Sequence, residues 1–166
     1  MSEPMKPMEI EQRSFAIITE LLGDRVLAPE NELVIKRVIH TTADFDYADN
    51  LAFSPDVIEQ AKAALCNGAT IVTDTNMALS GISKPSLTKL GAKALCLMAD
   101  PDIAREAKER GVTLAVVSME HAARLDGPLI FAVGNAPTAL IRLHELIGKG
   151  EVKPALVIGV PVGFVN

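Results

Sequence analysis

The sequence has few aromatic residues and few cysteines. It contains no Trp, one Tyr and five Phe, so its core must be built from aliphatic side chains and methionine. The two cysteines, Cys66 and Cys96, lie inside apolar segments, and their spacing matches no metal site. We therefore expect two buried structural thiols, no disulfide framework and a cytoplasmic protein.

Positive charge and long hydrophobic runs are also scarce. The net charge of −5 argues against a nucleic-acid partner, since such proteins need a basic footprint. Apolar runs end well before the roughly 20 residues of a membrane span, so no membrane partner is expected. Three scattered histidines give no metal spacing. The chain also lacks a G-x-G-x-x-G fingerprint, a P-loop and a G-x-S-x-G elbow, and we expect no metal and no cofactor.

Hydrophobic residues make up 49% of the 166 residues, which fits a single domain over residues 1–166. Four apolar runs predict strands buried on both faces, at residues 70–73, 94–98, 129–133 and 155–160. Helical patterns cover residues 8–22, 33–39, 54–66 (with Ser54 as cap), 101–110, 118–125 and 136–147, whereas 112–117 fits a strand or a helix. This alternation predicts an α/β protein with a three-layer, flavodoxin-like doubly wound, mostly parallel sheet.

Ligands of such sheets bind beyond the carboxyl ends of the strands. Asp74 follows the first predicted strand and either orients a ligand or caps a helix. Gly134 and Asn135 open a strand-to-helix turn. Its N–H groups either bind an anion or belong to a plain turn with Asn135 as cap.

His40 ends an amphipathic helix, where the helix dipole favours a protonated imidazole. It is either a proton donor or a surface or capping histidine. The other two histidines, His121 and His144, have charged neighbours, and we expect both to be solvated.

Five segments together resemble the precorrin-8X methylmutase family. They are Ile10-Glu-Gln-Arg-Ser-Phe15, Arg37-Val-Ile-His-Thr-Thr-Ala-Asp44, Thr73-Asp-Thr-Asn-Met77, Gly134-Asn-Ala-Pro-Thr-Ala-Leu140 and Pro154-Ala-Leu-Val-Ile-Gly-Val-Pro-Val-Gly-Phe-Val165. The segments occur in the family's order and cover nearly the whole chain.

The resemblance implies an isomerase of cobalamin biosynthesis and a homodimer with sites near its interface. The implied reaction is the C-11 to C-12 methyl shift that converts the tetrapyrrole precorrin-8X, or cobalt-precorrin-8, to hydrogenobyrinic or cobyrinic acid. His40 matches the family's proton-donating histidine. The residues expected to bind substrate are Ser14, Arg37, Thr41, Asp74, Asn76, Gly134, Asn135 and Thr138.

The chain departs from the family pattern in three places, one of which is the region of the third segment, where Asn76 and Ala78 differ from the family. Family members usually continue past the last motif, so the family's C-terminal tail is expected to be absent, and Leu114 stands where an arginine is frequent. These departures leave a shortened, non-catalytic corrinoid-binding relative as the alternative. A flavin- or phosphate-binding flavodoxin-like protein is a third possibility that rests on fold alone.

Overall fold

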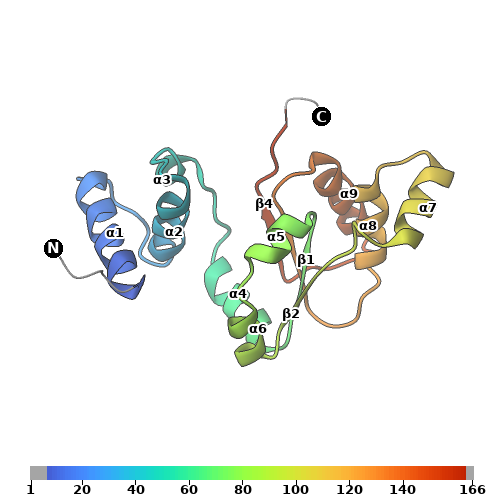
Figure 1. The fold of residues 1–166 in the computed structure, drawn as a ribbon, viewed down its shortest axis with the longest axis horizontal. Coiled ribbons are helices and arrows are strands. Elements are labelled where there is room, and N and C mark those ends of the chain that lie inside the picture. Colours follow the sequence, from blue (N-terminus) through green and yellow to red (C-terminus); the bar gives the residue numbers. More distant parts are fainter. Residues whose placement is uncertain (1–6, 164–166) are drawn as a thin grey trace. The chain divides into compact units, whose positions relative to one another are not determined.

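The computed structural model describes residues 7–163, in two compact units that meet in sequence at Ile58 and Glu59 (Figure 1). The first unit contains α1 (Pro7–Leu22), α2 (Glu32–Thr42) and α3 (Tyr47–Asn50). The second begins within α4 (Val57–Cys66) and continues through β1 (Thr70–Thr73), α5 (Asn76–Gly81), α6 (Lys84–Leu90), β2 (Lys93–Cys96), α7 (Pro101–Arg110), α8 (Leu114–Ala122), β3 (Leu129–Val133), α9 (Pro137–Gly148) and β4 (Leu156–Gly159).

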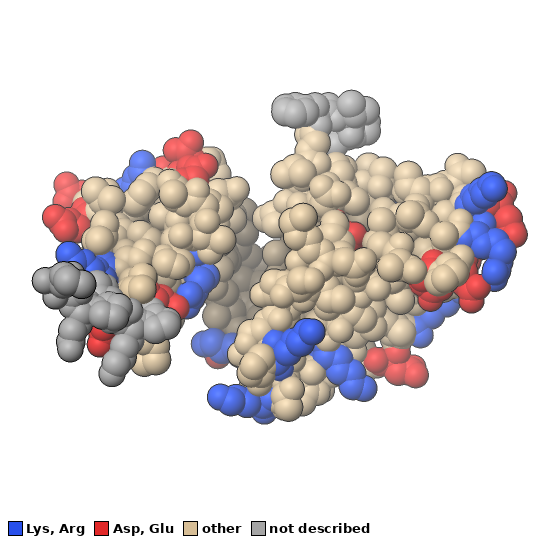
Figure 2. Space-filling view, in the orientation of Figure 1, with Lys and Arg blue, Asp and Glu red and all other residues tan. Residues whose placement is uncertain are grey.

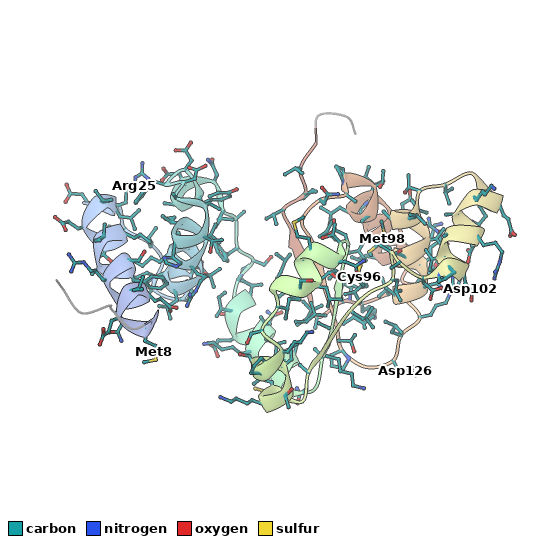
Figure 3. The ribbon with its side chains drawn as sticks, viewed as in Figure 1. Met8, Arg25, Cys96, Met98, Asp102 and Asp126 are labelled. Carbon is teal, nitrogen blue, oxygen red and sulfur yellow. The ribbon has the colours of Figure 1, made fainter. Side chains whose placement is uncertain are left out.

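The helical first unit has an aliphatic core. The buried side chains come from α1 and α2, at the helical spacings that the sequence predicts: Ile18, Leu22, Ile35 and Ile39. Arg25, labelled in Figure 3, follows α1; it donates to the Phe45 carbonyl at 3.2 Å and pairs with Asp49 of α3 at 3.4 Å. These contacts connect the segment after α1 to Phe45 and to α3.

The second unit is built on a four-stranded, all-parallel sheet in the order β2-β1-β3-β4. This is the order of the first four strands of the flavodoxin-like fold, so the predicted fold class and all four strands are confirmed. The strand order reverses between β1 and β3. Their carboxyl ends therefore mark the place where such sheets bind ligands.

Side chains that alternate along the strands face two different helical layers. Val72 and Phe131 pack in the cluster formed with α8 and α9. Their strand neighbours Ile71 and Ile130 pack with Ala64 of α4. Helices thus cover both faces of the sheet, which confirms the three-layer arrangement.

The expectation that every strand is buried on both faces is wrong for both edge strands. In β2 no residue is fully buried and Lys93 is exposed. The expectation also fails for β4. This edge strand is largely exposed, and Ile158 keeps 45% of its surface accessible. The expectation of two buried thiols is also wrong. Cys66 is exposed at the end of α4, and Cys96, labelled in Figure 3, is half-buried at the end of β2; both are free. Both cysteines lie in apolar runs of the sequence, but each is the last residue of its helix or strand, where the chain leaves the core.

Three helix predictions need correction or completion. Of the ambiguous residues 112–117, residues 114–117 form the first turn of α8, because the Thr113 side chain accepts from the Val116 N–H and caps this helix. The helix predicted over residues 118–125 therefore begins earlier, at Leu114, and ends at Ala122. The predicted start at Ser54 is wrong: Asp56 has φ 55°, and α4 begins only at Val57. The short helices α3, α5 and α6 were not predicted.

Ion pairs connect α7, α8 and α9, where Figure 2 shows charged side chains of both signs gathered over α7. Glu120 has an 8% exposed side chain and accepts from Arg110 at 2.5 and 2.9 Å and from Arg142 at 2.8 Å. Arg110 lowers the pKa of the Glu120 carboxyl. His121 is half-buried and bonded to Glu106 at 2.7 Å, so the expectation that it is solvated is wrong.

Over residues 7–163, no helix combines the length and apolarity needed to cross a membrane.

Candidate functional site

The first unit contains an apolar hollow of about 350 Å³ between α1 and the end of α2. This volume is at the lower end of the range usual for ligand pockets. Three polar side chains interrupt its wall: Arg13, Ser14 and His40. The remaining lining residues are Ile10, Ile17, Ile18, Leu21, Ile39, Ala43 and Phe45.

His40 is brought to this hollow by the way in which α2 ends. Ile35 and Ile39 are buried against α1, which turns the next residue to the rim of the buried face. Ala43 then adopts the left-handed conformation (φ 57°) and closes the helix with an N–H bond to the Ile39 carbonyl at 2.8 Å. His40 therefore lies in the last helical turn, as predicted.

Two consecutive residues of α1 hold the His40 ring. The Ser14 Oγ lies 2.7 Å from His40 Nδ1. The Phe15 ring meets the imidazole edge-on, with centroids 5.9 Å apart and planes at 63°. Residues at this distance and angle gain both packing and quadrupole attraction. The imidazole is thus held at one nitrogen and along one side.

Arg37, one helical turn before His40, is already engaged by α1. Its guanidinium stacks over the Phe15 ring at 5.1 Å from the centroid. It also pairs with the Glu11 carboxylate at 2.7 Å. The hydrogen bond from Arg37 lowers the pKa of Glu11, and the charge of His40 acts in the same direction. Glu11 therefore stays ionised to a lower pH than an ordinary glutamate.

The predicted site residues of the first unit thus differ in their surroundings. Ser14 and His40 lie together in the wall of the hollow. Arg37 is paired with Glu11, and the Thr41 hydroxyl donates back to the Arg37 carbonyl at 2.9 Å. Thr41 is exposed and bonded within its own helix.

The predicted site residues of the second unit centre on the reversal point of the sheet. Asp74 is only 1% exposed, directly after β1. Its carboxylate accepts the backbone N–H groups of Gly134 at 3.1 Å, Asn135 at 2.7 Å and Ala136 at 2.7 Å. The N-cap residue of α9 is Ala136, so the alternative of Asn135 as cap is wrong. Asp74 binds this turn across about sixty residues of sequence, and the three N–H groups are already satisfied.

Asn76 and Thr138 are exposed at the beginnings of α5 and α9. Thr75 caps α5 by accepting from the Ala78 N–H at 3.1 Å. The Thr113 hydroxyl donates to the Thr138 hydroxyl at 3.4 Å, which connects the starts of α8 and α9. The side chains of Asn76, Asn135 and Thr138 therefore remain accessible at this edge.

Sequence reasoning did not assign a role to Glu11 or Phe15, although both lie in the quoted Ile10–Phe15 segment. The available signal was their spacing. Residues 11, 14 and 15 share one face of a helix, and residues 37 and 40 share one face of the next. Within residues 7–163, no cluster of three or more His, Cys, Asp or Glu side chains could hold a metal ion.

Comparisons with known proteins agree on one family. The profile described as precorrin-8X methylmutase matches residues 9–166. A cobalt-precorrin-8 methylmutase of Salmonella typhimurium is 44% identical, over 97% of this chain and 78% of that protein. A precorrin-8X methylmutase of Pseudomonas aeruginosa is 36% identical, over 95% and 75%. The solved structure of precorrin-8X methyl mutase from Thermus thermophilus superposes with a TM-score of 0.85 at 39% identity, covering 95% of this chain and 76% of that one.

Proposed function

The chain belongs to the precorrin-8X methylmutase family, isomerases of cobalamin biosynthesis, and we propose that His40 is the proton donor of its C-11 to C-12 methyl shift. The observation that supports this role is an imidazole in the wall of an apolar hollow, fixed at Nδ1 by Ser14. The family relationship favours this enzyme over the alternative of a non-catalytic corrinoid-binding relative.

A sigmatropic shift requires few reactive groups from the protein. The methyl group moves within one molecule, so bonds break and form without an external nucleophile. The protein must hold one conformer of the tetrapyrrole and supply a proton that favours the rearranged product. A positioned acid of this kind contributes roughly 10²–10⁴-fold to the rate.

The substrate carries many carboxylates, whereas the chain has a net charge of −5. We therefore propose that individual hydrogen-bond donors recognise the substrate carboxylates, and that the net charge of the protein does not attract them. Arg13, in the wall of the hollow, is one such donor. Asn76, Asn135 and Thr138 are proposed to contact substrate at the sheet edge.

Asp74 and Gly134 are proposed to act on substrate through the shape of the turn that they form together. Thr41 remains a proposed contact at the end of α2.

We also propose a cellular location, an oligomeric state and a domain organisation for this enzyme. Two free thiols suit a reducing compartment, which supports a cytoplasmic location. The resemblance also supports a homodimer, which sedimentation of the purified protein will test. We retain one functional domain over residues 1–166, because the family match extends through both units.

The proposed role of His40 is tested by His40→Ala and His40→Asn, with conversion of precorrin-8X and of cobalt-precorrin-8 followed by absorbance. Both variants should lose about 10²–10⁴-fold in kcat. Product Kd should change less than about threefold, because an acid used in the transition state contributes little to ground-state binding. Equal losses in kcat and in affinity would show that His40 only binds or packs. A folded wild-type protein that binds both substrates and converts neither would refute the enzyme.

A further inference from the structure

We propose that Ser14 is a positioning residue that holds His40 at Nδ1, so that Nε2 is the nitrogen that delivers the proton. This inference rests on the proposed role of His40. The sequence predicted that Ser14 binds substrate, whereas this inference assigns it to His40. It also assigns the reaction to one atom of the imidazole.

The geometry of α1 and α2 supports this assignment. The Ser14 Oγ to His40 Nδ1 distance of 2.7 Å is that of a good hydrogen bond. Both side chains line the hollow, so their contact lies in the wall of the proposed substrate site. Because one ring nitrogen is occupied by Ser14, the opposite nitrogen is the one available to a substrate.

The ring is held in its plane by a second set of contacts. Phe15 lies edge-on to the imidazole, and Arg37 stacks on Phe15 while pairing with Glu11. The Glu11–Arg37 pair therefore restrains Phe15, and Phe15 restrains His40. Glu11, Ser14 and Phe15 belong to one face of α1, so a single helix turn supplies both the hydrogen bond and the packing.

This arrangement accounts for each bond that changes when His40 protonates the substrate. In the imidazolium form, Nδ1–H donates to the Ser14 Oγ and Nε2–H faces the substrate. The Nε2–H bond breaks, its electron pair stays on Nε2, and the proton forms a bond to the substrate. The neutral imidazole that remains keeps Nδ1–H and its hydrogen bond to Ser14. The ring therefore does not have to reorient during the step, which lowers the reorganisation that catalysis requires.

A serine beside a histidine also has two other uses, and each makes a different prediction. A substrate-binding Ser14 would contribute with or without the imidazole. A nucleophilic Ser14 activated by His40 would form a covalent adduct with an electrophilic probe such as a fluorophosphonate. A positioning Ser14 acts only through His40 and forms no adduct.

The decisive experiment is a double-mutant cycle with Ser14→Ala, His40→Ala and the combined variant, with steady-state kcat and KM measured on the full chain. Ser14→Ala should lower kcat by about 10- to 100-fold with KM changed less than about threefold, because misorientation costs rate rather than binding. In the His40→Ala background the same change should alter kcat by less than about twofold. Ser14→Thr, which keeps the hydroxyl, should restore most of the lost rate.

Thr19→Ala is the matched control. Thr19 lies on the same helix, is exposed, and donates its hydroxyl only to the Phe15 carbonyl at 2.8 Å among the contacts that the structure records. It should keep the wild-type kcat and KM. Thermal unfolding of every variant will show that each is folded at the assay temperature.

The outcomes separate this inference from the proposed function. If His40→Ala is inactive and Ser14→Ala keeps the wild-type kcat, His40 remains the donor and the role of Ser14 is refuted. An equal loss from Ser14→Ala in both backgrounds, or a covalent adduct at Ser14, also refutes it. If His40→Ala keeps the wild-type kcat, the proposed function itself fails.

Discussion

Replacing Asp74 by Asn should destabilise the second unit far more than an Asp→Asn change normally does. The buried carboxylate accepts three backbone N–H groups, and two of them share one oxygen. An Asn side chain retains one oxygen, so its best orientation keeps the bonds to Asn135 and Ala136. The Gly134 N–H would then face an amide NH₂ group that cannot accept a hydrogen bond.

The expected magnitude follows from these three contacts. A buried N–H left without an acceptor costs about 1–3 kcal/mol. The two retained bonds also weaken, because a charged acceptor is roughly twice as strong as a neutral one. The total loss in the free energy of unfolding is about 2–5 kcal/mol. For a chain of this length, that loss lowers Tm by about 5–15 °C.

The measurement combines denaturant unfolding, followed by far-UV circular dichroism, with hydrogen exchange of the peptide that contains residues 134–136. Exchange of those amides should accelerate in Asp74→Asn. Asp100→Asn is the matched control: Asp100 caps α7 by accepting from the Asp102 N–H at 2.8 Å, it is exposed, and Asn is an equally good cap. A loss below about 0.5 kcal/mol in Asp74→Asn, with unchanged exchange, would refute the reasoning.

Three further outcomes follow from contacts in the second unit. Arg110→Ala should cost about 1–3 kcal/mol in denaturant unfolding, because it removes two hydrogen bonds from the nearly buried Glu120 carboxylate; Lys108→Ala, an exposed change on the same helix, is its control. The pKa of Glu120 is lowered by Arg110, so its contribution is complete above the ordinary glutamate pKa and is lost as pH falls through the lowered value. Unfolding at about pH 3 and pH 6 should therefore show a smaller acid loss in Arg110→Ala, and an equal loss in both proteins would contradict this. Gly68→Ala should reduce stability by about 1–2 kcal/mol, since Gly68 has φ +75° and an added Cβ would lie 3.3 Å from the Gly91 carbonyl oxygen; a stabilised variant would contradict this.

Local patterns predicted the sheet well because its strands are short, aliphatic and bounded by polar residues. The runs at 70–73 and 129–133 match β1 and β3 in both bounds. The helices α5 and α6 lack a clear apolar face, and no side chain of either is buried. Their remaining signal was the caps Thr75 and Ser83, with a proline in the first turn of α6. Propensity without burial is a weak guide to a short helix.

The site shows the same division between local and distant information. The position of His40 near the end of a helix follows from the amphipathic pattern that precedes it. Its contact with Ser14 joins residues 26 apart, and the bond from Gly134 to Asp74 joins residues 60 apart. Such pairs depend on how helices and strands pack. The sequence could name the residues but could not show that Asp74 faces backbone amides instead of a ligand.

The contact of Asp74 with the start of α9 limits which ligands the second unit could be redesigned to bind. Many doubly wound proteins hold the phosphate of a nucleotide or flavin against amides at this location. Here the carboxyl group of Asp74, which belongs to the chain itself, occupies that position. Redesign of the second unit as a nucleotide binder would therefore have to begin by removing Asp74, because a phosphate and this side chain compete for the same three donors.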